Sequence, residues 1–224
     1  MLDIFTFISK NKRTGKSTLA GRMAELHHSI LERRSGYSPV PPKIALVDCS
    51  ESGDLSRWHS HREWSPGLHV FCTSGVHYLD VLSDIQDGAY TAVYVDLPEN
   101  SLGDEVLAAF SGAQFVMPAL PGQHESELAH IDEIAKEVVN SCEDEQNFRV
   151  ALLPNRWADP CSSGLGKLDL RWPGITVLSP VPECEEFSLE NEEPIDGLAM
   201  ALLARTWHEL QALQAPVDVV KVAA

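Results

Sequence analysis

The sequence predicts an α/β fold with one mostly parallel, twisted sheet of about seven strands and helices on both faces. Short apolar runs recur between longer segments in which apolar residues follow helical spacing, which is the pattern of strands joined by crossover helices. Several of these runs are continuously apolar, as in strands buried on both faces. A chain of 224 residues is long enough for one such domain with a substantial core. We therefore expect a single domain over residues 1–215 and a short tail over 216–224.

The expected strands are distributed along the whole chain. They are rich in β-branched and aromatic residues, which favour strands. In order, the runs are Leu2–Ile8, Lys43–Val47, Leu68–Cys72, Ala92–Asp96, Gln114–Ala119, Phe148–Leu153 and Ile175–Leu178.

Helical spacing occupies most of the segments between these strands. The expected helices are Lys16–Arg34, Gly75–Ile85, Leu102–Phe110, Glu125–Val139 and Pro194–Leu213. In the last of them, Trp207 and a stripe of leucines are expected to face the core; these leucines are Leu198, Leu202, Leu203 and Leu210. Residues 36–42 are rich in turn formers and residues 183–193 carry six glutamates, so both segments are expected to be loops.

The composition limits the classes of partner. The chain has 17 lysines and arginines against 33 aspartates and glutamates, a formal net charge of −16. We therefore expect weak non-specific DNA binding and no membrane association, because both need clustered basic residues. A local basic patch stays open as an alternative; its members would be Lys10, Lys12, Arg13, Arg33 and Arg34.

Two further observations concern the compartment. No apolar run reaches the roughly 18 residues of a membrane-spanning helix, and the N-terminus lacks the pattern of a secretory signal. The five cysteines include no CxxC pair, which is in keeping with reduced thiols. We expect a soluble, cytoplasmic protein.

The strongest indication of function is the tetrapeptide Gly15-Lys16-Ser17-Thr18, which lies between the first expected strand and the first long helix. Backbone N–H groups at such a place can surround phosphate oxygens, a lysine can neutralise β and γ phosphates, and a serine hydroxyl can bind Mg²⁺. An ordinary helix start is the alternative, but the position directly after an apolar strand favours a phosphate site. The pattern G-x-x-x-x-G-K-[ST] would need glycine where the chain has Lys10, whereas K-G-G-x-G-K-[ST]-T aligns with residues 11–18.

This alignment and several later segments resemble the ParA/MinD group of deviant Walker A ATPases. The matching segments are Ala45–Ser50 (ALVDCS, for VDxDPQG), Val93–Pro98 (VYVDLP, for the Walker B segment), Phe115–Glu125 (FVMPALPGQHE), Leu152–Arg156 (LLPNR) and Pro180–Glu183 (PVPE). They occur in the family's order and cover most of the chain. The resemblance implies a single-domain P-loop NTPase that binds ATP or ADP with Mg²⁺.

The resemblance also implies roles for individual residues. Lys16 would hold the phosphates, Ser17 would ligate Mg²⁺, and Thr18 would add a phosphate contact. Asp96 would orient the Mg²⁺ shell, and Asp48 would lie close by, with a strand-end turn residue as its alternative role. The phosphate loop would comprise Lys12, Arg13, Thr14, Gly15, Lys16, Ser17 and Thr18. The residues near adenine would be Asn155, Pro182 and Glu183, although Asn155 could equally be a turn former after a strand.

Three departures from the family's pattern affect catalysis. The signature lysine, which reaches the partner's phosphate in a nucleotide-bridged dimer, falls on Asn11, with Lys10 and Lys12 beside it. The two glycines of the loop fall on Lys12 and Arg13, which disfavour positive φ, so we expect a loop of altered shape. The second aspartate of VDxD, which positions the attacking water in the family, is Ser50. These changes predict retained nucleotide binding with very slow hydrolysis.

Two functions follow as expectations. The first is a ParA-like partition or positioning ATPase, in which ATP closes a homodimer that recruits a protein partner or cargo adaptor, with plasmid or DNA segregation or cargo positioning as its role. The alternative is a degenerate ParA-like adaptor that binds a protein partner with little or no hydrolysis. The pair His59 and His61 has no third spaced ligand, so we expect a polar surface there and not a metal site.

Overall fold

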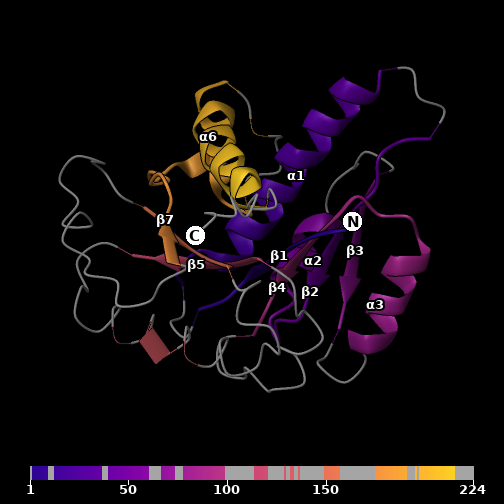
Figure 1. Ribbon diagram of the computed structural model, residues 1–224, viewed down its shortest axis with the longest axis horizontal. Coiled ribbons are helices and arrows are strands. Elements are labelled where there is room, and N and C mark those ends of the chain that lie inside the picture. The colour runs from indigo at the N-terminus through magenta and orange to yellow at the C-terminus, as the bar shows by residue number, and fades with distance from the viewer. Residues whose placement is uncertain are drawn as a thin grey trace, which may run out of the picture.

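The computed structural model has the predicted α/β architecture (Figure 1). It describes residues 2–9, 13–36, 40–60, 67–73, 78–98, 114–120, 129, 132–133, 136, 149–156, 175–190, 195 and 197–214. The strands are β1 (Asp3–Phe7), β2 (Ile44–Asp48), β3 (Leu68–Cys72), β4 (Ala92–Asp96), β5 (Gln114–Ala119), β6 (Arg149–Pro154) and β7 (Ile175–Val177). They form one sheet of seven strands in the order β3-β2-β4-β1-β5-β6-β7. Every neighbouring pair is parallel, which confirms the predicted sheet.

The order of the strands determines where a ligand can bind. β1 lies between β4 and β5, and the chain builds the sheet first on one side of β1 and then on the other. Open α/β sheets bind ligands at such a switch point, outside the carboxyl ends of the strands. At these ends Asp96 of β4 is the register partner of both Phe7 on β1 and Asp48 on β2.

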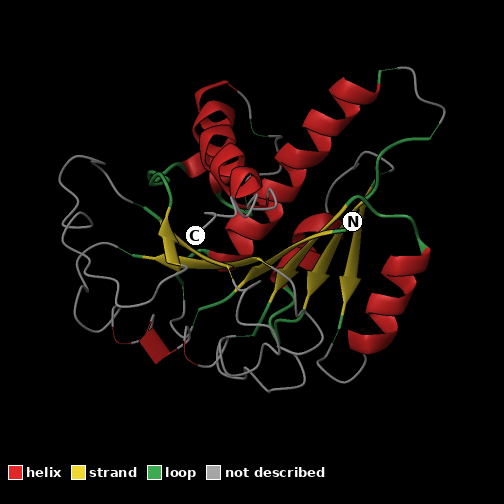
Figure 2. Ribbon diagram, viewed as in Figure 1, coloured by secondary structure: helices red, strands yellow, loops and turns green. Residues whose placement is uncertain are grey.

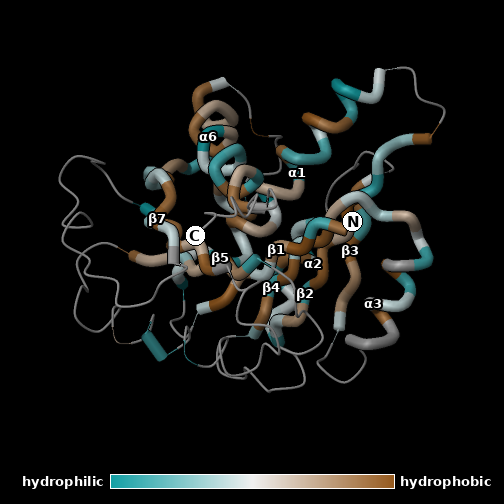
Figure 3. Tube along the Cα trace, viewed as in Figure 1, coloured by the Kyte–Doolittle hydropathy of each residue, from teal (hydrophilic) through white to brown (hydrophobic). Residues whose placement is uncertain are grey.

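Helices cover both faces of the sheet (Figures 1 and 2). The helices are α1 (Lys16–Ser35), α2 (Asp54–Ser60), α3 (Tyr78–Asp87) and α6 (Gly197–Gln214), with a short 3-10 helix η2 (Glu185–Phe187). Alternate residues of β4 separate the two cores. Tyr94 packs in the core that α1, α2 and α6 share, whereas Val93 and Val95 pack in the core that includes Ile85 of α3. Figure 3 shows the apolar strands between helices of mixed polarity.

A buried polar group lies between the sheet and two helices. The Tyr94 hydroxyl, on β4, lies 3.0 Å from Nδ1 of His27 on α1 and accepts a hydrogen bond from Nε1 of Trp207 on α6 at 3.1 Å. Because an indole N–H can only donate, the Tyr94 oxygen is the acceptor of the bond from Trp207. Burial lowers the pKa of His27 to about 4, so the ring is neutral at pH 7.

The structure corrects three details of the predicted elements. α2 and η2 were not predicted, because seven and three residues are too short for a recognisable period. Leu198 was expected in the core but is 75% exposed, since it lies in the first turn of α6; Leu203, Trp207 and Leu210 are buried as predicted.

Some predicted segments fall outside the described residues. These include the helix expected over residues 102–110 and the tail expected over residues 216–224, whose boundary stays a prediction. Of the helix expected over residues 125–139, the described residues 129, 132–133 and 136 are helical. Within the described part of the chain, no helix combines the length and apolar character needed to cross a membrane.

Candidate functional site

The segment that was predicted to bind phosphate is the turn between β1 and α1. Its described part, residues 13–18, is called the phosphate loop below. Gly15 caps α1 in the left-handed region at φ 84°, and its carbonyl accepts a hydrogen bond from the Leu19 N–H at 2.9 Å. The first turn of α1 contains no acidic residue. Its N–H groups are therefore free of a competing carboxylate from that turn and can bind an anion.

Arg13 adopts a glycine-like backbone. Its φ is 62°, although a left-handed residue with a side chain costs about 1 to 2 kcal/mol. Arg13 therefore takes the positive φ despite its side chain, and the expected change of loop shape stays a prediction because Lys12 lies outside the described residues. Asn11, Lys12 and Lys10, among which the signature lysine was sought, lie outside the described residues.

Lys16 and Asp96 form a buried ion pair. Lys16 Nζ donates a hydrogen bond to Asp96 Oδ1 at 2.6 Å, and the two side chains are 6% and 0% exposed. Burial raises the pKa of Asp96 above its ordinary value, while the Lys16 ammonium and a hydrogen bond from Ser17 offset part of the rise. A phosphate that enters the loop would compete with Asp96 for the Lys16 ammonium.

The carboxylate of Asp96 and the hydroxyl of Ser17 suit a hard cation. Among the described residues, nothing hydrogen-bonds to the second oxygen of Asp96, Oδ2, although it is buried. Such an orphaned oxygen is costly. Ser17 contacts the same carboxylate, and oxygen donors of this kind are the ligands that Mg²⁺ prefers. These two residues therefore fit the Mg²⁺ site that the resemblance implied.

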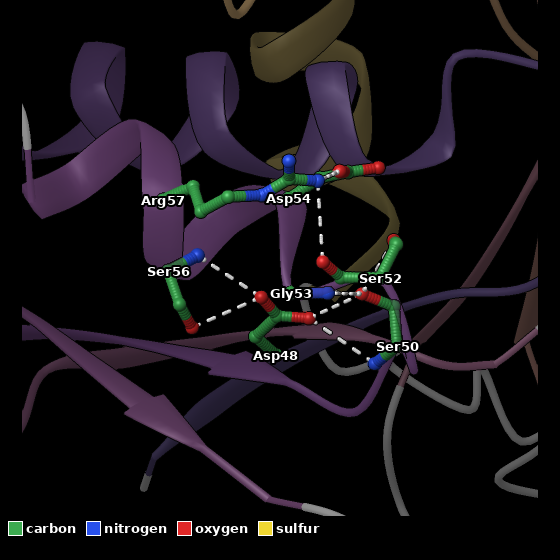
Figure 4. Close-up of polar contacts among 7 residues, drawn as sticks. All are labelled: Asp48, Ser50, Ser52, Gly53, Asp54, Ser56 and Arg57. Carbon is green, nitrogen blue, oxygen red and sulfur yellow. Dashed lines mark hydrogen bonds and ion pairs between the residues drawn. The ribbon is translucent and has the colours of Figure 1, made fainter.

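Asp48, at the end of β2, is saturated by serines of its own segment (Figure 4). Its Oδ1 accepts hydrogen bonds from Ser50 N at 3.1 Å and Ser50 Oγ at 2.6 Å. Its Oδ2 accepts from Ser56 N and Ser56 Oγ, both at 3.0 Å. The carboxylate therefore ties the end of β2 to the first turn of α2, a structural role close to the strand-end alternative.

Ser50 takes part in the same structure. Its hydroxyl donates to Asp48 and accepts from Gly53 N at 3.2 Å and Ser52 Oγ at 3.3 Å. Neither Asp48 nor Ser50 lines the two clefts described next. Ser50 stands where the family has its water-positioning aspartate, and its hydroxyl is thus used in hydrogen bonds within its own segment.

Two adjoining clefts open beside the phosphate loop. The first has a volume of about 700 Å³ and contains the whole loop, together with Asp54, Arg57 and Trp58 of α2. The second has a volume of about 540 Å³ and lies towards the ends of β6 and β7. The residues that line both are Gly15, Thr18, Arg156 and Ser188. The two clefts therefore meet at the phosphate loop.

The second cleft contains the residues that were expected near adenine. Asn155, Pro182 and Glu183 all line it, together with Gly15 and Thr18 of the phosphate loop, and their contact with adenine stays a prediction. Asn155 also has a structural contact, because its Nδ2 donates a hydrogen bond to the Thr14 carbonyl at 2.6 Å. It therefore belongs both to the cleft and to the support of the loop.

Arg22 is a residue that the sequence analysis missed. Its side chain is fully buried in α1 and donates to the carbonyls of Phe187 at 3.3 Å and Ser188 at 2.7 Å. It also pairs with Glu25 at 2.8 Å and lies 5.5 Å from the ring centre of Trp58. Arg22 thus holds the segment between the two clefts against α1. Its only sequence signal is a charge within an otherwise core-facing stretch of the helix.

The histidines offer no metal site in the described part of the chain. His59 Nε2 donates to the Leu68 carbonyl at 3.3 Å, and burial lowers its pKa. His61 lies outside the described residues. No group of three or more potential metal-ligating side chains occurs among the residues that the structure describes.

Comparisons with known proteins give a likeness in fold. No protein-family model matches the chain, and no curated protein matches it in sequence. Among solved structures, apo McdA from Cyanothece superposes with a TM-score of 0.68 at 12% identity, over 95% of this chain and 99% of McdA. The MinC:MinD cell division protein complex of Aquifex aeolicus superposes with a TM-score of 0.65 at 17% identity, over 94% of this chain and 96% of the matched chain. A plasmid partition protein from Borrelia burgdorferi superposes with a TM-score of 0.61 at 12% identity, over 94% of this chain and 98% of the partition protein.

These neighbours are the kind of protein that the sequence motifs predicted. A McdA variant has also been solved in complex with ATP. At these identities the likeness concerns the fold, and it extends over nearly the whole of each chain. The resemblance to the ParA/MinD group is confirmed at that level: the chain has the fold that McdA, MinD and the plasmid partition protein share.

Proposed function

We propose that the protein is a ParA/MinD-type nucleotide switch that binds ATP with Mg²⁺, forms a homodimer in that state and hydrolyses ATP slowly. The observation that carries the proposal is Lys16 of the phosphate loop, which lines a cleft of about 700 Å³ and pairs with the buried Asp96. The loop offers helical N–H groups and a lysine, which together recognise phosphates. The adjoining second cleft, with Asn155, Pro182 and Glu183, would take the adenine.

Mg²⁺ would be held by Ser17 and Asp96, the latter directly or through water. When bound, the ion neutralises charge on the β and γ phosphates. The protein's own contribution is to release Lys16 from Asp96 to the phosphates and to place Thr18 and the loop N–H groups around them.

Slow turnover follows from the engaged side chains at the end of β2. Asp48 accepts four hydrogen bonds, and the Ser50 hydroxyl makes three within its own loop. Both groups are occupied by these bonds and would not hold the attacking water. The same observation supports a second candidate function, an adaptor that binds nucleotide and a protein partner with no turnover.

The remaining parts of the proposal concern partners and location. A cytoplasmic switch of this kind would recruit a protein partner or cargo adaptor through its dimer, for plasmid or DNA segregation or for cargo positioning. Non-specific DNA binding would be weak at a net charge of −16.

Calorimetric titration with ATP and Mg²⁺ tests nucleotide binding. Lys16→Ala is expected to weaken binding by about 1.5 to 3 kcal/mol, the contribution of a charge-assisted contact. Lys43→Ala is a matched control, because Lys43 is a half-buried lysine whose Nζ donates to the Gly88 carbonyl at 3.3 Å, and it lines neither cleft. Circular dichroism checks that both variants fold. Equal affinity of the wild type and Lys16→Ala would refute the proposal.

Two measurements then separate the two candidate functions. A phosphate-release assay at saturating ATP reports turnover, and analytical ultracentrifugation with ATP or ADP reports the dimer. Slow turnover with an ATP-dependent dimer supports the switch. ATP binding without phosphate release supports the adaptor.

A further inference from the structure

Positive charge is concentrated in the first cleft of this acidic protein. Four cationic side chains line it, from the phosphate loop, from α2 and from the end of β6; they are Arg13, Lys16, Arg57 and Arg156. Only two acidic residues, Asp54 and Glu190, are among the described residues that line it. In a chain with a net charge of −16, this excess suits a polyanionic ligand.

Arg57 is held in this cleft by a structured segment. Its Nη2 donates to the Ser52 carbonyl at 3.2 Å and pairs with the Asp54 carboxylate (Figure 4). Its backbone N–H donates to the Gly53 carbonyl at 3.0 Å. The bonds from Ser50 and Ser56 to Asp48 hold the same segment to the end of β2. The position of the guanidinium is therefore built into the fold before any ligand enters.

The guanidinium still has capacity to bind a ligand. The side chain is 68% exposed, and its Nε and Nη1 donors have no partner among the described residues. A guanidinium binds phosphate through two parallel hydrogen bonds, for which this arrangement leaves donors available. Asp54 serves as its counterion while no phosphate is present.

Arg57 belongs to the cleft that contains the phosphate loop. It lines the first cleft but not the second, which contains Asn155 and Pro182. A nucleotide with its base in the second cleft would direct its terminal phosphate away from that cleft, towards the part that α2 lines.

We propose that Arg57 binds the terminal phosphate of the nucleoside triphosphate and supplies, from the same chain, the cation that is missing at Asn11. This inference rests on the proposed function and adds a residue that distinguishes ATP from ADP. Because ADP lacks the terminal phosphate, Arg57 contributes to the affinity for ATP alone.

The test compares the affinities for ATP and ADP, each with Mg²⁺, by calorimetric titration. Arg57→Ala and Arg57→Gln are expected to weaken ATP binding by about tenfold or more and to leave ADP binding within about twofold. Arg57→Lys keeps a positive charge but lacks the planar guanidinium. Its affinity for ATP is expected to lie between that of these two variants and that of the wild type. Arg205→Ala is the matched control: Arg205 is 70% exposed, pairs with Glu209 four residues later, and lines neither cleft.

The outcomes separate this inference from the proposed function. Loss of ATP affinity in Lys16→Ala, with unchanged ATP affinity in Arg57→Ala, would overturn the inference and leave the nucleotide site intact. Equal weakening of ATP and ADP binding by Arg57→Ala would also overturn it, since the contact would not be with the terminal phosphate. Unchanged affinity in Lys16→Ala would refute the proposed function itself.

Discussion

The side-chain amide of Asn155 donates a hydrogen bond to the Thr14 carbonyl at 2.6 Å and joins the end of β6 to the phosphate loop across 141 positions of the chain. The same amide excludes a side chain from the neighbouring glycine, because a Cβ added at Gly15 would lie 2.3 Å from Asn155 Nδ2. The shape of the loop therefore depends on a residue from the other half of the sheet.

We predict that Asn155 and Gly15 are energetically coupled. Asn155→Ala should lower the free energy of unfolding by about 1 to 3 kcal/mol, because the buried Thr14 carbonyl loses its donor. Gly15→Ala should be more destabilising, since it adds the steric clash to a strained φ of 84°. In the double variant the clash is absent, so the cost of Gly15→Ala should fall to about 1 to 2 kcal/mol for the φ alone.

Urea denaturation of the four proteins in this cycle measures the coupling. Strictly additive effects would contradict the contact between the two residues.

We predict that Arg13→Gly is more stable than Arg13→Ala by about 1 kcal/mol. Both variants lose the same side chain, but only glycine adopts the observed φ of 62° without steric cost. Arg34, an exposed arginine in the last turn of α1, provides the control. At this position the Arg34→Gly variant should be less stable than Arg34→Ala, because the backbone is helical. Thermal and urea unfolding of the glycine and alanine variants at both positions would measure the difference in stability within each pair. This difference should have opposite signs at Arg13 and Arg34, and the same sign at both would exclude a left-handed Arg13.

We predict a loss of stability between pH 7 and pH 5 that His27 causes in part. Its pKa falls from 6.5 to about 4 in the folded state, so the unfolded chain binds more protons over this range and unfolding becomes easier as the pH falls. The full effect of such a shift is about 3 kcal/mol and is complete only below pH 4. The stability that the neutral His27 ring contributes is fully present above pH 6.5 and decreases as the pH falls towards 4.

His28 and His59 also have lowered pKa values and act in the same direction. The difference in pH dependence of the unfolding free energy between the wild type and His27→Gln therefore gives the contribution of His27 alone. Urea denaturation at pH 7, 6 and 5 should show a smaller pH dependence in the variant. Identical pH dependence in both proteins would mean that His27 is not the neutral ring beside Tyr94.

The strands and the phosphate loop could be predicted because their signals are local. Each strand from β1 to β7 is a short, mostly apolar run, and its observed ends lie close to the predicted ones. Gly15, Lys16 and Ser17 are neighbours in the sequence, so a short motif suffices to identify the loop. α2 was missed because seven residues are too short to show a period. Its first turn also depends on the carboxylate of Asp48, eight residues before Ser56.

The roles of the acidic and basic side chains were harder to predict. Asp48 was placed in the catalytic set by the resemblance of its segment to the family's, but the conformation of residues 50–56 decides that serines occupy both of its oxygens. Arg22 is 165 positions from Phe187, the carbonyl of which it binds. No local pattern contains information about such a pair.

The sequence by itself determined the α/β class, the order of strands and helices along the chain, and the phosphate motif, because each depends on residues within a few positions of one another. Only the tertiary structure decided which side chains meet at the carboxyl ends of the strands. The sheet order places β1 beside β4 and β5, and this arrangement brings Asp96 to Lys16. Hydrogen bonds and ion pairs act over a few ångströms, so the partners of Lys16, Asn155 and Arg22 are settled only when distant segments pack together.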